Sequence, residues 1–118
     1  KTAPYGKATV EALKNANIYK KIKDRFVYGE SISQTVMYAT KMADLGLIAK
    51  SALYSPLMSH YKKGISWIDL GPKLYTPIKQ GIVILKEGKG SSDVRSFYDF
   101  LLSESAKEIF KKFGYILP

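Results

Sequence analysis

The chain has 118 residues, 46% of them hydrophobic, and a formal net charge of +9 at pH 7. This length and composition suit one folded domain with a real core and argue against disorder. The chain has no Cys, which excludes disulfides, thiol catalysis and Cys-based metal sites, and no apolar run approaches the ~18 residues that a membrane span needs.

The opening residues, KTAPYGK, carry no apolar signal segment and no initiating Met, so we expect a processed or trimmed piece of a longer protein. Hydrophobic spacing then predicts helices alternating with strands, which favours an α/β fold. The expected helices span, in order, 7–15, 31–42, 51–57 and 93–103, with a last one that Ser103 caps and Gly114 ends; a short amphipathic turn is expected at 18–22. The expected strands span 25–28, 46–49, 65–68 and 81–85, the last being an apolar run typical of a strand covered on both faces.

The junction FVYGESISQTV, residues 26–36, has the form of an anion-binding socket. A β-type run breaks at Gly29 and restarts as a helix capped by Ser31, and Gln34 completes a capping box by reaching back to the Ser31 amide. First-turn amides that stay free bind phosphate-like or sulfate-like groups without a cationic side chain. Most such junctions bind nothing, so structural capping stays open as the alternative. A second junction of this type, near Ser51, strengthens the prediction of a pocket, because ligands of α/β sheets gather at the carboxyl ends of strands.

The positive charge does not indicate nucleic-acid binding. Seventeen of the 19 basic residues are Lys, most of them scattered, with small clusters at 20–25 and 62–63. Base readout and bidentate phosphate contacts favour Arg. We therefore expect no nucleic-acid partner, although a positive field would still draw a small anion to a cleft.

An enzyme is the main alternative class, and the residues offer it little support. The single His, His60, lies in an expected loop, and no G-x-S-x-G, H-E-x-x-H or P-loop motif accompanies it. Glu30 beside Ser31 is explained by the dipole of the helix that follows. We expect no catalytic residue, no metal site and no cofactor.

Four segments occur in an order and spacing that point to one family: VYGESISQTV, DLGLIAKSAL, LYTPIKQGIVIL and VRSFYDFLLSESAKEIFKKFGY. They resemble the periplasmic molybdate-binding proteins of ABC importers, which have the type II solute-binding fold. The resemblance begins at Ala3–Ala8 and spans nearly the whole chain. The pattern FYDFLLS is shared by many solute-binding proteins, so it marks the fold more than the ligand.

The resemblance implies a three-layer α/β lobe of a type II periplasmic solute-binding protein, with a mixed central sheet flanked by helices. Residues 1–84 would form the second ligand-binding lobe, and residues 85–118 a C-terminal helical segment that packs on a first lobe outside this chain. The first lobe would contribute its own ligand loops, so we expect the chain alone to bind weakly. The apolar faces of the last two helices would be free to pair two copies in a crystal.

The resemblance also assigns the oxyanion contacts to neutral donors. One contact falls on Tyr28 or Gly29, and another on a backbone amide near Leu53. Some family members bind with a Tyr where this chain has Gln80, so the donor here is the Gln80 amide, or a hydroxyl of Tyr75 or Tyr28. Donor-only groups suit molybdate, whose oxygens all accept. They reject monohydrogen phosphate, because its own donor would face other donors, at about 1–3 kcal/mol per unsatisfied group.

The implied function is that of the substrate-binding component of an ABC importer. Such a protein is exported to the periplasm, does not span the membrane, binds molybdate or tungstate and delivers it to a membrane permease; no signal segment is seen in this chain. Two alternatives stay open: a protein that binds sulfate or another oxyanion, and the ligand-sensing effector domain of a transcriptional regulator, which reuses the same fold. An export signal or a DNA-binding segment upstream would distinguish them.

Overall fold

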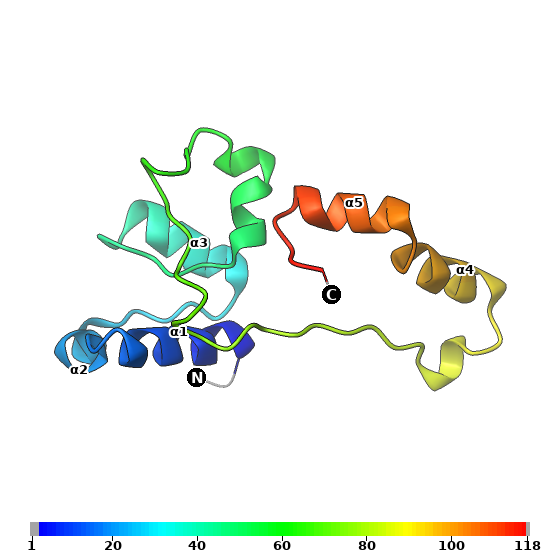
Figure 1. Ribbon diagram of the computed structural model, residues 1–118, viewed down its shortest axis with the longest axis horizontal. Coiled ribbons are helices and arrows are strands. Elements are labelled where there is room, and N and C mark those ends of the chain that lie inside the picture. Colours follow the sequence, from blue (N-terminus) through cyan, green and yellow to red (C-terminus); the bar gives the residue numbers. More distant parts are fainter. Residues whose placement is uncertain (1–2, 118) are drawn as a thin grey trace. The chain divides into compact units, whose positions relative to one another are not determined.

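The computed structural model describes residues 3–117 as helices joined by turns and extended segments (Figure 1). The α-helices are α1 (Pro4–Asn15), α2 (Tyr19–Ile22), α3 (Ile32–Lys41), α4 (Ser92–Leu101) and α5 (Glu104–Lys112). Short 3-10 helices are η1 (Lys23–Arg25), η2 (Lys50–Tyr54), η3 (Pro56–Met58) and η4 (Lys86–Gly88). The chain divides into two compact units, unit 1 (Lys1–Ile78) and unit 2 (Lys79–Pro118).

The helices begin and end where local chemistry directs. Helix α1 starts at Pro4, earlier than predicted. Proline suits the first position of a helix because its φ is helical and because the N–H that it lacks would have no partner there. Ser31 and Ser103 cap α3 and α5 as predicted. Gly114 follows α5 with a φ of 78°, the left-handed conformation expected of a residue that ends a helix.

The predicted central sheet is not formed by residues 3–117. The β-pairing described there is an isolated parallel bridge between Lys63 and Trp67. The backbone at Phe26, Ala49 and Leu85 is extended, as a strand requires, but these segments have no neighbouring strand to take their amides and carbonyls. The sheet of the α/β class therefore stays a prediction.

The expectation that residues 81–85 lie deep in a sheet is wrong for this chain. Ile82, Val83 and Leu85 are exposed, Val83 to 80%. The physical reason is that an apolar strand becomes buried only when other elements cover both of its faces. Within unit 2 no neighbouring strand pairs with this segment in the described residues.

The buried residues of unit 1 come from α1 and from the segment of η2 and η3. They include Ala12, Leu13, Ala49 and Met58. Gly46 lies against α3 so closely that a Cβ built on it would overlap the Ala39 Cβ and lie 2.9 Å from the Ala39 Cα. The glycine therefore allows the segment before η2 to pack on α3.

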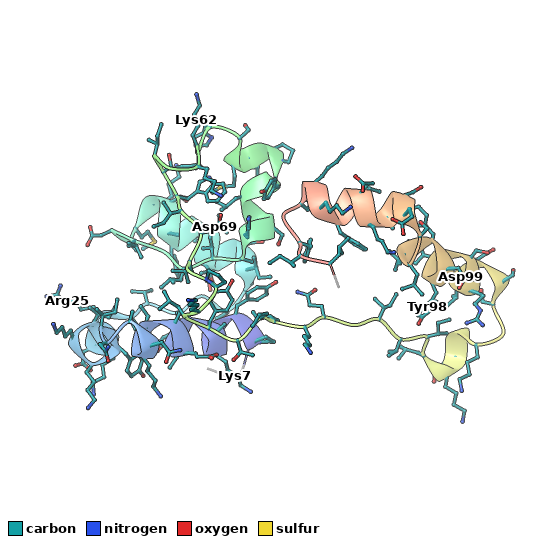
Figure 2. The ribbon with its side chains drawn as sticks, viewed as in Figure 1. Lys7, Arg25, Lys62, Asp69, Tyr98 and Asp99 are labelled. Carbon is teal, nitrogen blue, oxygen red and sulfur yellow. The ribbon has the colours of Figure 1, made fainter. Side chains whose placement is uncertain are left out.

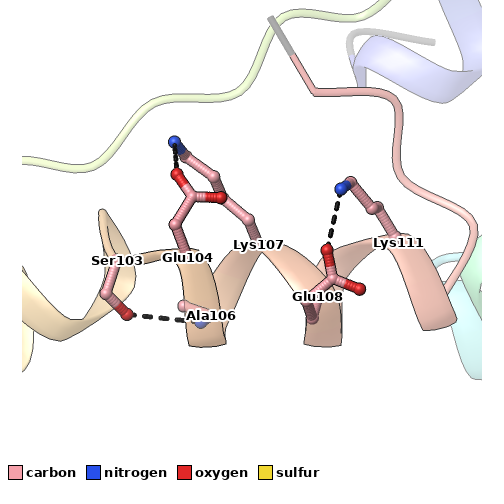
Figure 3. Close-up of polar contacts among 6 residues, drawn as sticks. All are labelled: Ser103, Glu104, Ala106, Lys107, Glu108 and Lys111. Carbon is pink, nitrogen blue, oxygen red and sulfur yellow. Dashed lines mark hydrogen bonds and ion pairs between the residues drawn. The ribbon is translucent and has the colours of Figure 1, made fainter.

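In unit 2, α4 and α5 are joined by a short turn at Leu102–Ser103, and Ala106 is buried. Figure 3 shows how α5 is stabilised along its exposed side: Ser103 caps the Ala106 amide, and two ion pairs join Glu104 to Lys107 and Glu108 to Lys111. Within residues 3–117, no helix is both long enough and apolar enough to cross a bilayer.

Candidate anion-binding site

The first predicted junction forms at the start of α3. The Ser31 hydroxyl accepts a hydrogen bond from the Gln34 amide at 3.1 Å, which confirms the predicted cap. The reciprocal bond differs from the prediction: the Gln34 side-chain oxygen accepts from the Glu30 amide at 2.6 Å, not from the Ser31 amide. The Gln34 side chain thus reaches one residue further back and fixes the turn that leads into the helix.

Two amides at this helix start are left for a ligand. The Gln34 amide donates to the Ser31 hydroxyl, and the Thr35 amide donates to the Ser31 carbonyl at 3.0 Å. The amides of Ile32 and Ser33 have no hydrogen-bond partner among residues 3–117. They are uncharged donors at the positive end of a ten-residue helix.

Gly29 is required at this junction for steric reasons. A Cβ built on it would overlap the Thr35 hydroxyl and lie 2.8 Å from the Thr35 amide nitrogen. Thr35 is itself fixed, because its hydroxyl donates to the Ser31 carbonyl at 2.9 Å. A side chain at position 29 would therefore push the entering backbone away from the first turn of α3.

Tyr28 stands just before this turn on an extended segment, and its side chain is 52% exposed. Its ring makes an edge contact with Phe26 at 5.9 Å between centroids, and Phe26 makes another with Tyr19 at 5.8 Å. These contacts hold the Tyr28 ring and leave its hydroxyl free to serve a ligand.

The second junction also forms, but with a different helix from the one predicted. The expected single helix 51–57 is divided into η2 and η3, and the backbone of Ser55 between them is extended (φ −70°, ψ 150°). The reason is Pro56, which disfavours helical geometry in the preceding residue. Ser51 is not the cap either: η2 starts at Lys50, preceded by Ala49, and Leu53 lies inside it.

The amides of Lys50 and Ser51 open η2 and have no hydrogen-bond partner in the described part of the chain. The contact near Leu53 that the resemblance implies lies further along η2, and it stays a prediction. Lys50 shares the carboxylate of Asp69 with Lys63: the Asp69 oxygens lie 3.0 Å from the Lys50 ammonium and 2.5 Å from that of Lys63. Hydrogen bonds from Lys63 and Lys50 hold the pKa of Asp69 below its usual range.

Tyr75 is positioned by two contacts that the sequence did not predict. Asn15 donates to the Leu74 carbonyl at 2.9 Å, and a Glu11 carboxylate oxygen accepts from the Thr76 amide at 3.0 Å and from the Thr76 hydroxyl at 2.8 Å. Both residues beside Tyr75 are therefore tied to α1. No motif in the sequence signals these pairs, since they join positions 59 and 65 residues apart.

The predicted site residues fall in both units. Tyr28 and Gly29 are neighbours at the first junction. Leu53 and Tyr75 lie elsewhere in unit 1, and Gln80 belongs to unit 2. The described residues include no group of three His, Asp or Glu side chains able to hold a metal ion. The chemistry assembled at both junctions is hydrogen-bond donation by neutral groups.

Comparison with known proteins gives the class of this chain. It belongs to the family of bacterial extracellular solute-binding proteins, whose family model matches residues 1–116. Among its curated relatives are the molybdate-binding protein ModA of Rhodobacter capsulatus, 37% identical over 117 residues, and that of Azotobacter vinelandii, 36% identical over 116 residues. The lipoprotein YvgL of Bacillus subtilis, a putative ABC transporter substrate-binding protein by its description, is 29% identical over 117 residues.

These alignments cover 97–98% of this chain but 42–45% of each relative, so the chain spans a little under half the length of the curated relatives it matches. The resemblance to molybdate-binding proteins noted from the four sequence segments is thereby confirmed. No solved structure matches the chain significantly.

Proposed function

We propose that this chain is part of the substrate-binding component of an ABC importer and that it contributes one wall of a cleft for molybdate or tungstate. The observation that carries the proposal is the match, over nearly the whole chain, to two relatives described as molybdate-binding. The amides of Ile32 and Ser33, and those of Lys50 and Ser51, are the donors that this wall offers.

Neutral donors explain the choice of a fully deprotonated oxyanion. Each hydrogen bond to a charged acceptor contributes about 1.5–3 kcal/mol, and a protonated oxyanion would lose one or more of these. Lys50, beside the second junction, is paired with Asp69, which Lys63 also contacts, so its charge is offset only in part and the oxyanion contacts proposed there are main-chain amides. Tyr28 and Tyr75 hydroxyls and the Gln80 amide complete the proposed donor set.

The proposed localisation and partner follow from the same assignment: the protein acts in the periplasm and delivers its oxyanion to a membrane permease. We also propose that residues 85–118 form a segment that packs on another lobe. Apolar side chains of α4 and α5 that remain exposed support this, including Phe97, Ile109 and Phe113. Pairing of two copies through these faces is the competing outcome, which gel filtration would reveal as a dimer.

The test is a titration of the ¹⁵N-labelled 118-residue chain with molybdate, tungstate, sulfate and phosphate, followed by amide NMR shifts. Molybdate and tungstate are expected to shift the amides of residues 32, 33, 50 and 51, weakly but saturably. Tyr28→Phe removes one hydroxyl and keeps the ring contact with Phe26, so it should weaken binding. Tyr98→Phe, in α4, is the matched control and should not. If sulfate shifts the same amides with equal affinity, the molybdate assignment is wrong.

A further inference from the structure

A basic depression lies at the corner between α1 and α2, and its lining residues are different from those of the two junctions described above. It is lined by Lys14, Asn17, Tyr19, Lys20 and Lys23 and has a volume of about 490 Å³. No carboxylate lines it. None of the proposed oxyanion contacts belongs to it, so this feature needs its own explanation.

The chain reversal at the end of α1 creates this depression. Asn17 adopts the left-handed conformation, with a φ of 59°, and the chain turns directly into α2. Lys14, in the last turn of α1, is thereby brought to the same depression as Lys20 and Lys23. Lys20 and Lys23 are three residues apart and so face one side of the short helical segment.

The negative end of α1 offsets only a small part of these charges. Its dipole is equivalent to about −0.5 elementary charge, whereas Lys14, Lys20 and Lys23 each carry a full positive charge. No carboxylate lies among the lining residues. The depression therefore keeps a positive potential.

Residues 14–25 contain five basic side chains and a single acidic one, Asp24. The Lys14 ammonium is held at the wall, 5.5 Å from the centroid of the Tyr19 ring. Figure 2 shows Arg25, which follows the lining residues, directed outward at this end of unit 1. Bringing three ammonium groups to one depression costs free energy through mutual repulsion, and an anion bound among them relieves that cost.

We propose that this depression is a second anion site, specific for phosphate groups carrying more than one negative charge and distinct from the neutral-donor site at the two junctions. Lys14, Lys20 and Lys23 supply the charge, and the side chains of Asn17 and Tyr19 supply hydrogen bonds. Lys ammonium groups act as hydrated point charges, which favours a compact polyanion over a planar carboxylate.

The test uses inorganic pyrophosphate as the probe on the ¹⁵N-labelled 118-residue chain. Shifts are expected at residues 14–23, with an affinity that falls as NaCl is raised. The variant Lys14→Gln/Lys20→Gln/Lys23→Gln should weaken binding about tenfold or more. The matched control, Lys41→Gln/Lys62→Gln/Lys73→Gln, removes the same charge at exposed positions elsewhere and should bind like the parent chain. Equal weakening in both variants, or shifts spread over all Lys-bearing surfaces, would overturn the site.

Vesicles of phosphatidylglycerol and phosphatidylcholine distinguish the two sources of phosphate. If the headgroup of a membrane lipid is the natural ligand, the parent chain sediments with these vesicles, pyrophosphate competes, and the depression variant no longer sediments. If pyrophosphate binds and vesicles do not, the ligand is a free anion. Binding of neither probe refutes the proposal. Molybdate shifts at residues 32, 33, 50 and 51 should persist in the depression variant, so the two sites fail or succeed separately.

Discussion

Gly46 allows a close approach between two segments that any side chain at this position would prevent. Its Cα faces Ala39 of α3, where a Cβ would overlap the Ala39 Cβ. Gly46→Ala should therefore destabilise unit 1 by about 1–3 kcal/mol, the usual result of overpacking. Urea unfolding measures this. Gly90→Ala is the control, because a Cβ there meets nothing within 4 Å. Equal urea midpoints for the two variants would refute the steric explanation.

Asp69 gives the chain a calculable pH dependence. Hydrogen bonds from Lys63 and Lys50 lower the Asp69 pKa, and the bond to Asp69 raises the Lys63 pKa. The contribution of Asp69 to stability is thus fully present above its unfolded pKa of about 4 and is lost as the pH falls through the lower folded value. The contribution of Lys63 is present below about pH 10 and is lost as the pH rises through its raised value.

Asp69→Asn should consequently lower the urea midpoint at pH 7 and lower it less at pH 2, because the parent carboxylate becomes protonated as the pH falls through its lowered pKa. The effect will be small, since all three side chains are well exposed. Asp44→Asn, at a position without an ion pair in the described residues, controls for the loss of one negative charge. A midpoint difference that is the same at both pH values would refute the ion-pair explanation.

At the scale of elements, helix α5 depends on its cap. The Ser103 hydroxyl accepts from the Ala106 amide at 3.3 Å (Figure 3). Ser103→Ala should destabilise α5 by about 1 kcal/mol, because one first-turn amide loses its acceptor. The rate of hydrogen exchange of the α5 amides measures this loss of stability in α5 itself. Ser105→Ala makes the same chemical change in the same helix without removing a cap and should not speed exchange.

Elements with local signals could be predicted from the sequence, and those that depend on distant partners could not. Ser31, Ser103 and Gly114 mark helix ends through hydrogen bonds or φ values within a few residues, and the structure has them as predicted. Residues 81–85 have the composition of a buried strand, but burial depends on what covers them. The apolar pattern predicts that residues 81–85 are buried, but burial requires neighbouring strands that this pattern does not specify.

The candidate site divides along the same line. The Ser31 cap and the Gly29 turn are local, so the sequence could predict them, whereas the Glu11–Thr76 and Asn15–Leu74 contacts join residues far apart in the chain. In the second junction the predicted helix 51–57 is divided because Pro56 stops helical geometry at Ser55, a local signal that was present in the sequence. Separately, η2 starts at Lys50, so the amides without a partner belong to Lys50 and Ser51, with Leu53 deeper in η2.

At the scale of the whole molecule, stability is divided unequally between the two units. The buried apolar residues are concentrated in unit 1, where Leu13 is only 7% exposed. In unit 2 the described core contains Ala106. Amide hydrogen exchange should accordingly be slower along α1 than along α4, since protection follows the apolar surface that an element buries.

Leu13→Ala tests whether the units open separately. The substitution should cost unit 1 about 2–5 kcal/mol through lost burial and a residual cavity. Exchange along α1 and α3 should then accelerate, while rates along α4 and α5 stay those of the parent chain, because unit 2 has its own contacts. Val83→Ala, at a side chain that is 80% exposed, should change neither set of rates. Acceleration in both units after Leu13→Ala would mean that the chain unfolds as one cooperative body and that the division at residues 78–79 has no energetic meaning.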